Sequence, residues 1–177
     1  MKKKLFIFSN ESISLQSGKH FCDNINLKST PEGLNKNFEV NLFGRKSNKD
    51  RSHEIKLKKI KIHSNILSYI FSVIKSAKEK GSKYLIISIP PYTFIVSLFL
   101  RLFGRKPVVY LQSDGYEEYK IILGKVGPFI YHLMFSITVA ISDIISCRDF
   151  ILKGKKGKLI SPSQLDSSWF RKFKLTD

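Results

Sequence analysis

Short apolar runs alternate with stretches of helical spacing along the chain, and this alternation limits the possible folds more than any other feature. The runs have the length of strands that are buried on both faces of a sheet. They are Lys4 to Ser9, Val40 to Phe43, Tyr84 to Ile89, Val108 to Leu111, Ile144 to Cys147 and Leu159 to Ser161. Helical stretches lie between them, at His20 to Leu27, Asn65 to Lys80, Thr93 to Phe103 and from Pro128 onward. The sequence therefore predicts an α/β protein with a Rossmann-like open, mainly parallel sheet and helices on both faces.

Four segments carry more specific expectations. The Ser-rich and Gly-containing stretch Asn10 to Lys19 is expected to be a loop that faces a ligand, and Gly44 to His53 a charged turn. From Ile55 to Ile62 apolar residues alternate with lysines with one slip, which predicts a half-exposed edge strand with a bulge. The helix of Asn65 to Lys80 is expected to have Ser64 or Asn65 as its N-cap and Gly81 as its stop.

Charge narrows the class of partner. The chain has 31 basic and 14 acidic residues, a net charge of +17, which favours a polyanionic neighbour such as a membrane leaflet, nucleic acid or a phosphorylated substrate. Of the cations 25 are Lys and only 6 are Arg, whereas base reading relies on Arg forks. A diffuse Lys surface therefore favours an anionic membrane over specific nucleic-acid binding. The alternative that remains is an ordinary solvated Lys-rich surface.

Location and metal binding are constrained by a few residue patterns. Cys22 and Cys147 lie far apart, and the four histidines form no ligand-like pair, so the pattern predicts neither a disulfide framework, a metal site nor a bound cofactor. Tyr84 to Phe103 and Phe129 to Ile145 are apolar, but prolines and polar residues interrupt them, so each is expected to divide into a strand and a helix. A cytoplasmic protein, peripheral to the inner face of the plasma membrane, is the expectation.

An acidic cluster directly follows one of the buried strands. Ligands of open parallel sheets bind beyond the carboxyl ends of the strands, so the loops after Ser9, Ile89 and Leu111 are the candidate site. Asp114 is the candidate catalytic residue, able to orient or deprotonate a hydroxyl. Its expected neighbours in substrate binding are Ser113, Gly115, Tyr116, Glu117 and Glu118. The structural alternative is that Asp114 is a turn or cap residue and that the two glutamates complement a helix N-terminus.

Two further segments are expected to bind substrate. Ser17, Gly18 and Lys19 are placed after the first strand, where a glycine lets the backbone approach a ligand and a helix N-terminus can face an anion, although a plain turn is the alternative. Ser88, Pro90 and Tyr92 end another strand in a rigid turn that would form one wall of a cleft.

Three segments resemble the N-terminal, acceptor-side domain of GT-B glycosyltransferases of the family-4-like group. They are YLIISIPP at 84–91, VVYLQSDG at 108–115 and LISPSQLDSSWF at 159–170. The last is similar to the segment with which that domain passes to the donor domain, although Ser163 and Gln164 replace the usual Asn-Gly. By this resemblance residues 1–161 are the acceptor-binding domain and residues 162–177 begin the connection to a donor-binding domain.

The resemblance implies transfer of a sugar from a nucleotide-sugar donor to an acceptor, often lipid-linked, in polysaccharide or glycolipid synthesis. It places Gly18 in the family's first glycine loop and Asp114 where the family has a His or Asp near the reaction centre. The family's donor half is a second Rossmann-like domain, so a donor-binding domain or subunit is an expected partner, and the chain is interpreted as truncated or as one part of a split enzyme. The alternatives are a non-catalytic membrane-anchoring subunit and a basic nucleic-acid-binding domain.

Overall fold

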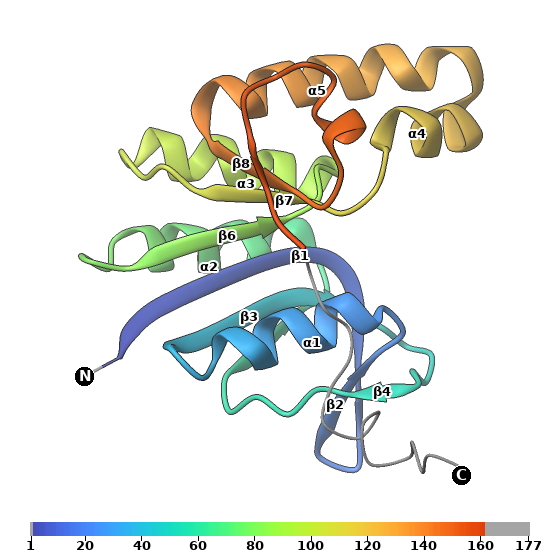
Figure 1. The fold of residues 1–177 in the computed structure, drawn as a ribbon. Helices are drawn as coiled ribbons and strands as arrows, with labels where there is room; N and C mark the ends of the chain where they lie inside the picture. The colour runs from blue at the N-terminus through green and yellow to red at the C-terminus, as the bar shows by residue number, and fades with distance from the viewer. Residues whose placement is uncertain (1, 162–177) are drawn as a thin grey trace, which may run out of the picture.

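The protein is an α/β protein with a mostly parallel mixed sheet (Figure 1). The computed structural model describes residues 2–161. The strands are β1 Lys3–Gln16, β2 Lys19–Cys22, β3 Phe38–Lys46, β4 His53–Glu54, β5 Ile60–His63, β6 Lys83–Ile87, β7 Val108–Leu111, β8 Asp143–Ser146 and β9 Lys158–Leu159. The helices are α1 Ile25–Leu34, α2 Ile66–Ala77, α3 Pro91–Leu102, α4 Gly115–Leu123 and α5 Gly127–Ile141, with the 3₁₀ turns η1 Gly124–Val126 and η2 Asp149–Leu152. The expected connection at residues 162–177 lies outside the described residues.

The parallel strands are arranged in the order β5-β3-β1-β6-β7-β8-β9. From β1 the chain first proceeds through β3 to β5, and then returns to the other side of β1 and proceeds through β6 to β9. This reversal beside the first strand is the arrangement of a doubly wound, Rossmann-type sheet. The α/β class and the mainly parallel sheet are thus confirmed.

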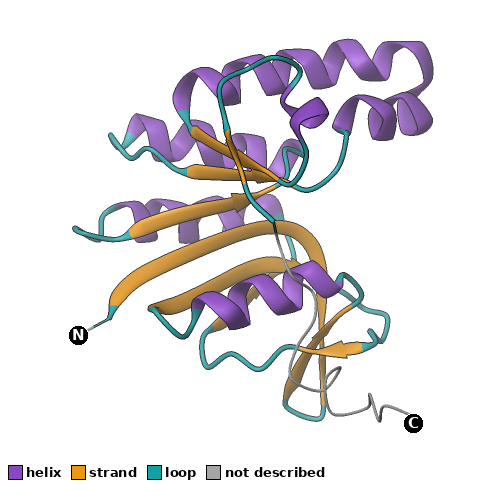
Figure 2. Ribbon diagram, in the orientation of Figure 1, coloured by secondary structure: helices purple, strands orange, loops and turns teal. Residues whose placement is uncertain are grey.

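Helices cover the two faces of the sheet unequally (Figure 2). Side chains of α2, α3 and α5 pack on the face that carries Phe6 and Phe8 of β1. Leu27 of α1 packs on the opposite face, with Leu5 and Ile7. Crossovers of one hand place connections that run in opposite directions along a sheet on opposite faces, which explains why α1 is separated from the other three.

β1 is much longer than its apolar run, and the segment 10–19, which was expected to be a loop, is strand and hairpin turn instead. The strand passes an irregularity in register between Phe8 and Ser12 and continues into a hairpin with β2, in which Gln16 lies opposite Lys19. The helix expected from His20 instead begins at Ile25, because the preceding residues form β2. Ile13 is fully buried and lies against Gly44. The alternation of the buried Ile13 with Ser12 and Ser14 is therefore the pattern of a strand.

The predicted edge strand over residues 55–62 is also only partly correct. Pairing is confined to β4, against β2, and to β5, against β3. Between them Ile55 turns inward, buried, and its N–H donates to the carbonyl of His20. The lysine and apolar alternation therefore arises from a connection that spans the gap between two strands. By contrast α2 is confirmed, with the Asn65 side chain accepting from the N–H of Ser68 at 2.9 Å and with Gly81 in the left-handed region after its end.

Both apolar stretches divide as expected. The first consists of β6 and α3 and the second of the larger part of α5 and β8. By length and composition alone, one helical stretch of the described residues, Gly115–Ile141, is long and apolar enough to cross a membrane.

The first residue of α5 tolerates no side chain. A Cβ on Gly127 would lie 1.9 Å from the carbonyl oxygen of Tyr119, whereas one on Gly33 in α1 would meet nothing within 4 Å. We expect Gly127→Ala to lower the free energy of unfolding by about 2 kcal/mol or more, because backbone must move. The matched Gly33→Ala variant should leave it unchanged or raise it by up to about 1 kcal/mol. Urea unfolding measures both, and equal effects would contradict this packing.

His63 in the edge strand β5 leads us to predict that the stability of the fold depends on pH. His63 stacks on Phe43, and burial, together with the charge of Lys61, holds its pKa below the ordinary 6.5. The unfolded chain then binds a proton more readily than the folded one, so the contribution to stability is present above pH 6.5 and is lost as the pH falls. His63→Phe should therefore reduce the loss of stability between about pH 7.5 and 5.5. An unchanged slope in urea unfolding would contradict this.

Candidate functional site

A cavity of about 690 Å³ opens at the point where the strand order reverses. It lies beyond the carboxyl ends of β1, β6 and β7, the position that open parallel sheets use for ligands. We call it the switch-point cavity. Its polar lining residues include Asn10, Glu11, Asn24, Ser88, Gln112 and Ser113, and its apolar wall includes Ile122, Leu123 and Tyr131.

The irregular part of β1 provides one side of this cavity. Ser9, Asn10 and Glu11 lie where the register with β3 shifts, so their side chains leave the regular alternation of the strand. The Ser9 hydroxyl accepts from the N–H of Glu11 at 3.1 Å, and its carbonyl accepts from the Tyr69 hydroxyl at 3.0 Å. Sequence reasoning missed Glu11. The signal available was that the first apolar run ends at these three polar residues.

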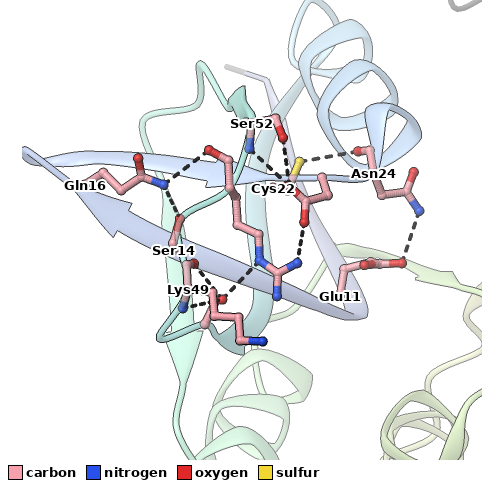
Figure 3. A network of polar contacts seen from close by, with 10 residues as sticks. Glu11, Ser14, Gln16, Cys22, Asn24, Lys49 and Ser52 are labelled. Atoms are coloured by element: carbon pink, nitrogen blue, oxygen red, sulfur yellow. Dashed lines mark hydrogen bonds and ion pairs between the residues drawn. The ribbon is translucent and has the colours of Figure 1, made fainter.

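Glu11 is held by the N-cap of α1 (Figure 3). The Asn24 amide donates to Glu11 Oε1 at 3.1 Å while its own oxygen accepts from the N–H of Asn26 at 2.9 Å. The neighbouring Asp23 pairs with Arg51 and accepts from Ser52, which fixes the start of α1 against the loop before β4. Glu11 and Asn24 are thus presented together on a braced wall of the cavity.

The turn after β6 forms a second wall, as expected. Ser88 has φ of 61°, a left-handed conformation that is unfavourable for a residue other than glycine. Its N–H donates to the Tyr110 carbonyl, and its carbonyl accepts from the buried hydroxyl of Thr93 at 2.9 Å. Backbone strain of this kind is concentrated at ligand sites. Ser88 and Pro90 line the cavity, whereas Tyr92 lies beside it, its ring under the guanidinium of Arg45.

Asp114 is tied to the fold by both carboxylate oxygens. It is the N-cap of α4: Oδ1 accepts from the N–H of Tyr116 at 3.0 Å, and Oδ2 accepts from the Lys153 ammonium at 2.6 Å. It lines a neighbouring cavity of about 610 Å³ together with Arg148 and Cys147. The capping alternative describes the contacts of Asp114, and its role as a base stays a prediction.

The other residues of the acidic cluster take different places. Ser113, Gly115 and Glu118 line the switch-point cavity. Glu117 faces Lys120 at 3.8 Å, and the Tyr116 hydroxyl lies 2.8 Å from His132 Nδ1. Burial raises the pKa of Tyr116, an effect that the nearby charge of Lys153 opposes. Tyr116 therefore links α4 to α5 and does not line the switch-point cavity.

Ser17, Gly18 and Lys19 are not brought to either of these two cavities. Ser17 and Gly18 form the turn of the β1–β2 hairpin, both with positive φ, and Lys19 pairs with Glu54 at 3.3 Å. The hairpin lies at the opposite end of the molecule from α4 in Figure 1. β2 separates these residues from the N-terminus of α1 at Ile25, so the glycine turn does not lead directly into a helix and the expected local geometry is wrong.

The lining of the switch-point cavity combines amide, hydroxyl and carboxylate side chains with aliphatic and aromatic ones, so the cavity can contact both polar and apolar parts of a ligand. Burial raises the pKa of the neighbouring Cys22 thiol to about 11, so this thiol is not a nucleophile at neutral pH. Within residues 2–161 no group of three His, Cys, Asp or Glu side chains is placed to hold a metal ion.

Comparison with known protein families, with curated proteins and with solved structures finds no match to this chain. The strand order alone defines the class of fold as α/β with a doubly wound, mostly parallel sheet.

Two variants distinguish the contribution of the Asp114 cap to stability from that of its ion pair with Lys153. Asp114→Ala removes both, and we expect it to lower the free energy of unfolding by about 1 kcal/mol or more. Asp114→Asn retains a good N-cap and loses only the pair with Lys153, so a smaller loss, under about 1 kcal/mol, is expected. Thermal unfolding of both variants measures this difference. Equal losses would show that the cap contributes nothing.

Proposed function

We propose that this chain is the acceptor-binding half of a GT-B glycosyltransferase and that the switch-point cavity holds the acceptor. The observation that carries the proposal is the position of this cavity, at the reversal of strand order and next to the segment 108–115 that resembles the family. Folds of this class carry many unrelated functions, so the residues that line the cavity decide which ligand it binds.

The lining of the cavity supports a saccharide ligand. Sugar hydroxyls both donate and accept, and Asn10, Glu11 and Gln112 offer both kinds of partner within one cavity. Glu11, positioned by Asn24, is the carboxylate that we assign to an acceptor hydroxyl.

The proposed reaction is sugar transfer from a nucleotide-sugar. The acceptor hydroxyl oxygen forms a bond to the anomeric carbon, the nucleoside diphosphate leaves, and the hydroxyl proton passes to a base. The donor would be held by a donor-binding domain or subunit. Asp114 is proposed to position the reacting group from the neighbouring cavity, which requires its carboxylate to leave Lys153. The Lys-rich surface would face the anionic cytoplasmic leaflet.

A second candidate is a non-catalytic subunit that anchors a catalytic partner at the membrane. One observation favours it: both oxygens of Asp114 already have structural partners. The two candidates differ in one measurement. With the donor-binding partner present, Asp114→Asn should lower turnover if Asp114 acts on the acceptor, and it should leave turnover unchanged if the chain is an anchor.

Binding to the cavity can be measured on this chain. Saturation-transfer NMR with a panel of pyranose mono- and disaccharides should show saturable binding, and uridine diphosphate glucose should not compete. Glu11→Gln should weaken the binding about tenfold, because a charged hydrogen bond is lost. Glu79→Gln, a carboxylate paired with Lys4 on the surface, should not. A site that takes the nucleotide-sugar and no saccharide would overturn the acceptor assignment.

A further inference from the structure

Large apolar side chains are concentrated on the outside of the α4–α5 hairpin. Ile121, Ile122 and Phe129 are 83%, 71% and 74% exposed. The same stretch adds further exposed residues, which are Leu123, Val126, Ile130 and Leu133. We call these seven residues the apolar tip. Exposed apolar side chains gathered in one short segment mark a site of association with a protein or a membrane.

The inner side of the hairpin already provides the packing that holds it together. Tyr116 lies edge-on to Tyr131 at 4.9 Å and Phe135 at 5.8 Å, and Tyr131 and Phe135 are buried. The backbones meet closely at Gly127. The apolar tip therefore faces away from the core, and the fold does not require its side chains to be apolar.

The α4–α5 hairpin is too short to cross a bilayer. The apolar stretch Gly115–Ile141 has the length of a span, but Gly124, with φ of 63°, and the turn η1 break it into two helices that pack on each other. The nine residues of α4 extend about 14 Å, roughly half of a hydrocarbon core of about 30 Å. The 15 residues of α5 extend about 22 Å, which is also short of this thickness. A hairpin that cannot span the bilayer can still bury an apolar surface in the interfacial layer.

Cations flank the apolar tip. Lys120 and Lys125 belong to the same segment and are exposed, and Lys120 lies 3.8 Å from the Glu117 carboxylate. Lys153, Lys155 and Lys156 in the loop after η2, and Lys158 at the start of β9, are also exposed. The Lys153 ammonium pairs with Asp114 and lies 5.4 Å from the centre of the Tyr116 ring, at the start of α4. An apolar surface bordered by lysines is complementary to an anionic bilayer, whose head groups are negative above an apolar interior.

We infer that the apolar tip inserts into the head-group region of an anionic membrane, with the flanking lysines on lipid phosphates. The inference rests on the membrane attachment within the proposed function and not on sugar transfer. Ile122 and Leu123 also line the switch-point cavity, so insertion places the mouth of this cavity at the membrane surface. An amphiphilic ligand then reaches the cavity without leaving the bilayer.

Flotation with phosphatidylglycerol-containing vesicles tests insertion. We expect the wild-type chain to stay partly bound at about 0.5 M salt, where electrostatic attraction is largely screened. Ile121→Ser combined with Phe129→Ser should lower partitioning about tenfold or more under these conditions. The matched control is Leu67→Ser with Phe71→Ser on α2, a pair that is 75% and 71% exposed, and it should bind as the wild type does.

The outcomes separate insertion from the wider proposal. Full release of the wild type by salt would overturn insertion and leave electrostatic attachment in place. Absence of binding to any anionic vesicle would overturn both. Equal losses in the two double variants would show that apolar exposure in general, and not the apolar tip, drives binding. The wild type could instead form a concentration-dependent dimer that is lost only in the Ile121→Ser and Phe129→Ser double variant. That result would assign the apolar tip to an interface with a second copy and would also overturn insertion.

Discussion

Everything in this structure is arranged around the central strand β1. Its first half pairs in parallel with β3 on one side and β6 on the other, and Ile7 and Phe8 are completely buried on its two faces. The two hydrophobic clusters of the protein therefore meet at adjacent residues of one strand. Because burial of apolar surface is the main favourable contribution to folding, both faces of the sheet depend on this strand.

The site follows from the same strand. The order of strands reverses beside β1, so the loops on its two sides diverge and leave a cavity between them. The register of β1 with β3 also shifts at this place, and the residues left out of that pairing, Ser9 to Glu11, line the cavity. Ser88, in a strained left-handed conformation, completes the opposite wall. A topological feature and two local irregularities thus coincide at one position, which favours a ligand site there.

The apolar residues of the α4–α5 hairpin fall into two groups, one buried and one exposed. Tyr131 and Phe135 pack on the sheet, whereas Ile121 and Phe129 point outward. Asp114 begins this hairpin and fixes it to Lys153 through its carboxylate. Asp114 is thus both the proposed positioning residue and the N-cap of the hairpin that carries the apolar tip. Asp114→Ala removes the cap and the Lys153 pair together, whereas Asp114→Asn retains the cap and loses only the pair.

Local periodicity determined the parts of this protein that depend on neighbouring residues. The apolar runs of β6 and β7, the α2 helix with its Asn65 cap and the α/β class were all correctly predicted, because burial and helix capping leave a pattern within a few residues. Only the tertiary structure decided the rest. Whether Ser17 to Lys19 form a ligand loop or a hairpin depends on pairing with a later strand. The partner of Asp114 lies 39 residues away. Exposure of the apolar tip depends on which face of each helix packs on the sheet. The spacing of apolar residues does not reveal this, because a face buried in the core and a face in contact with a membrane contain the same kinds of residue.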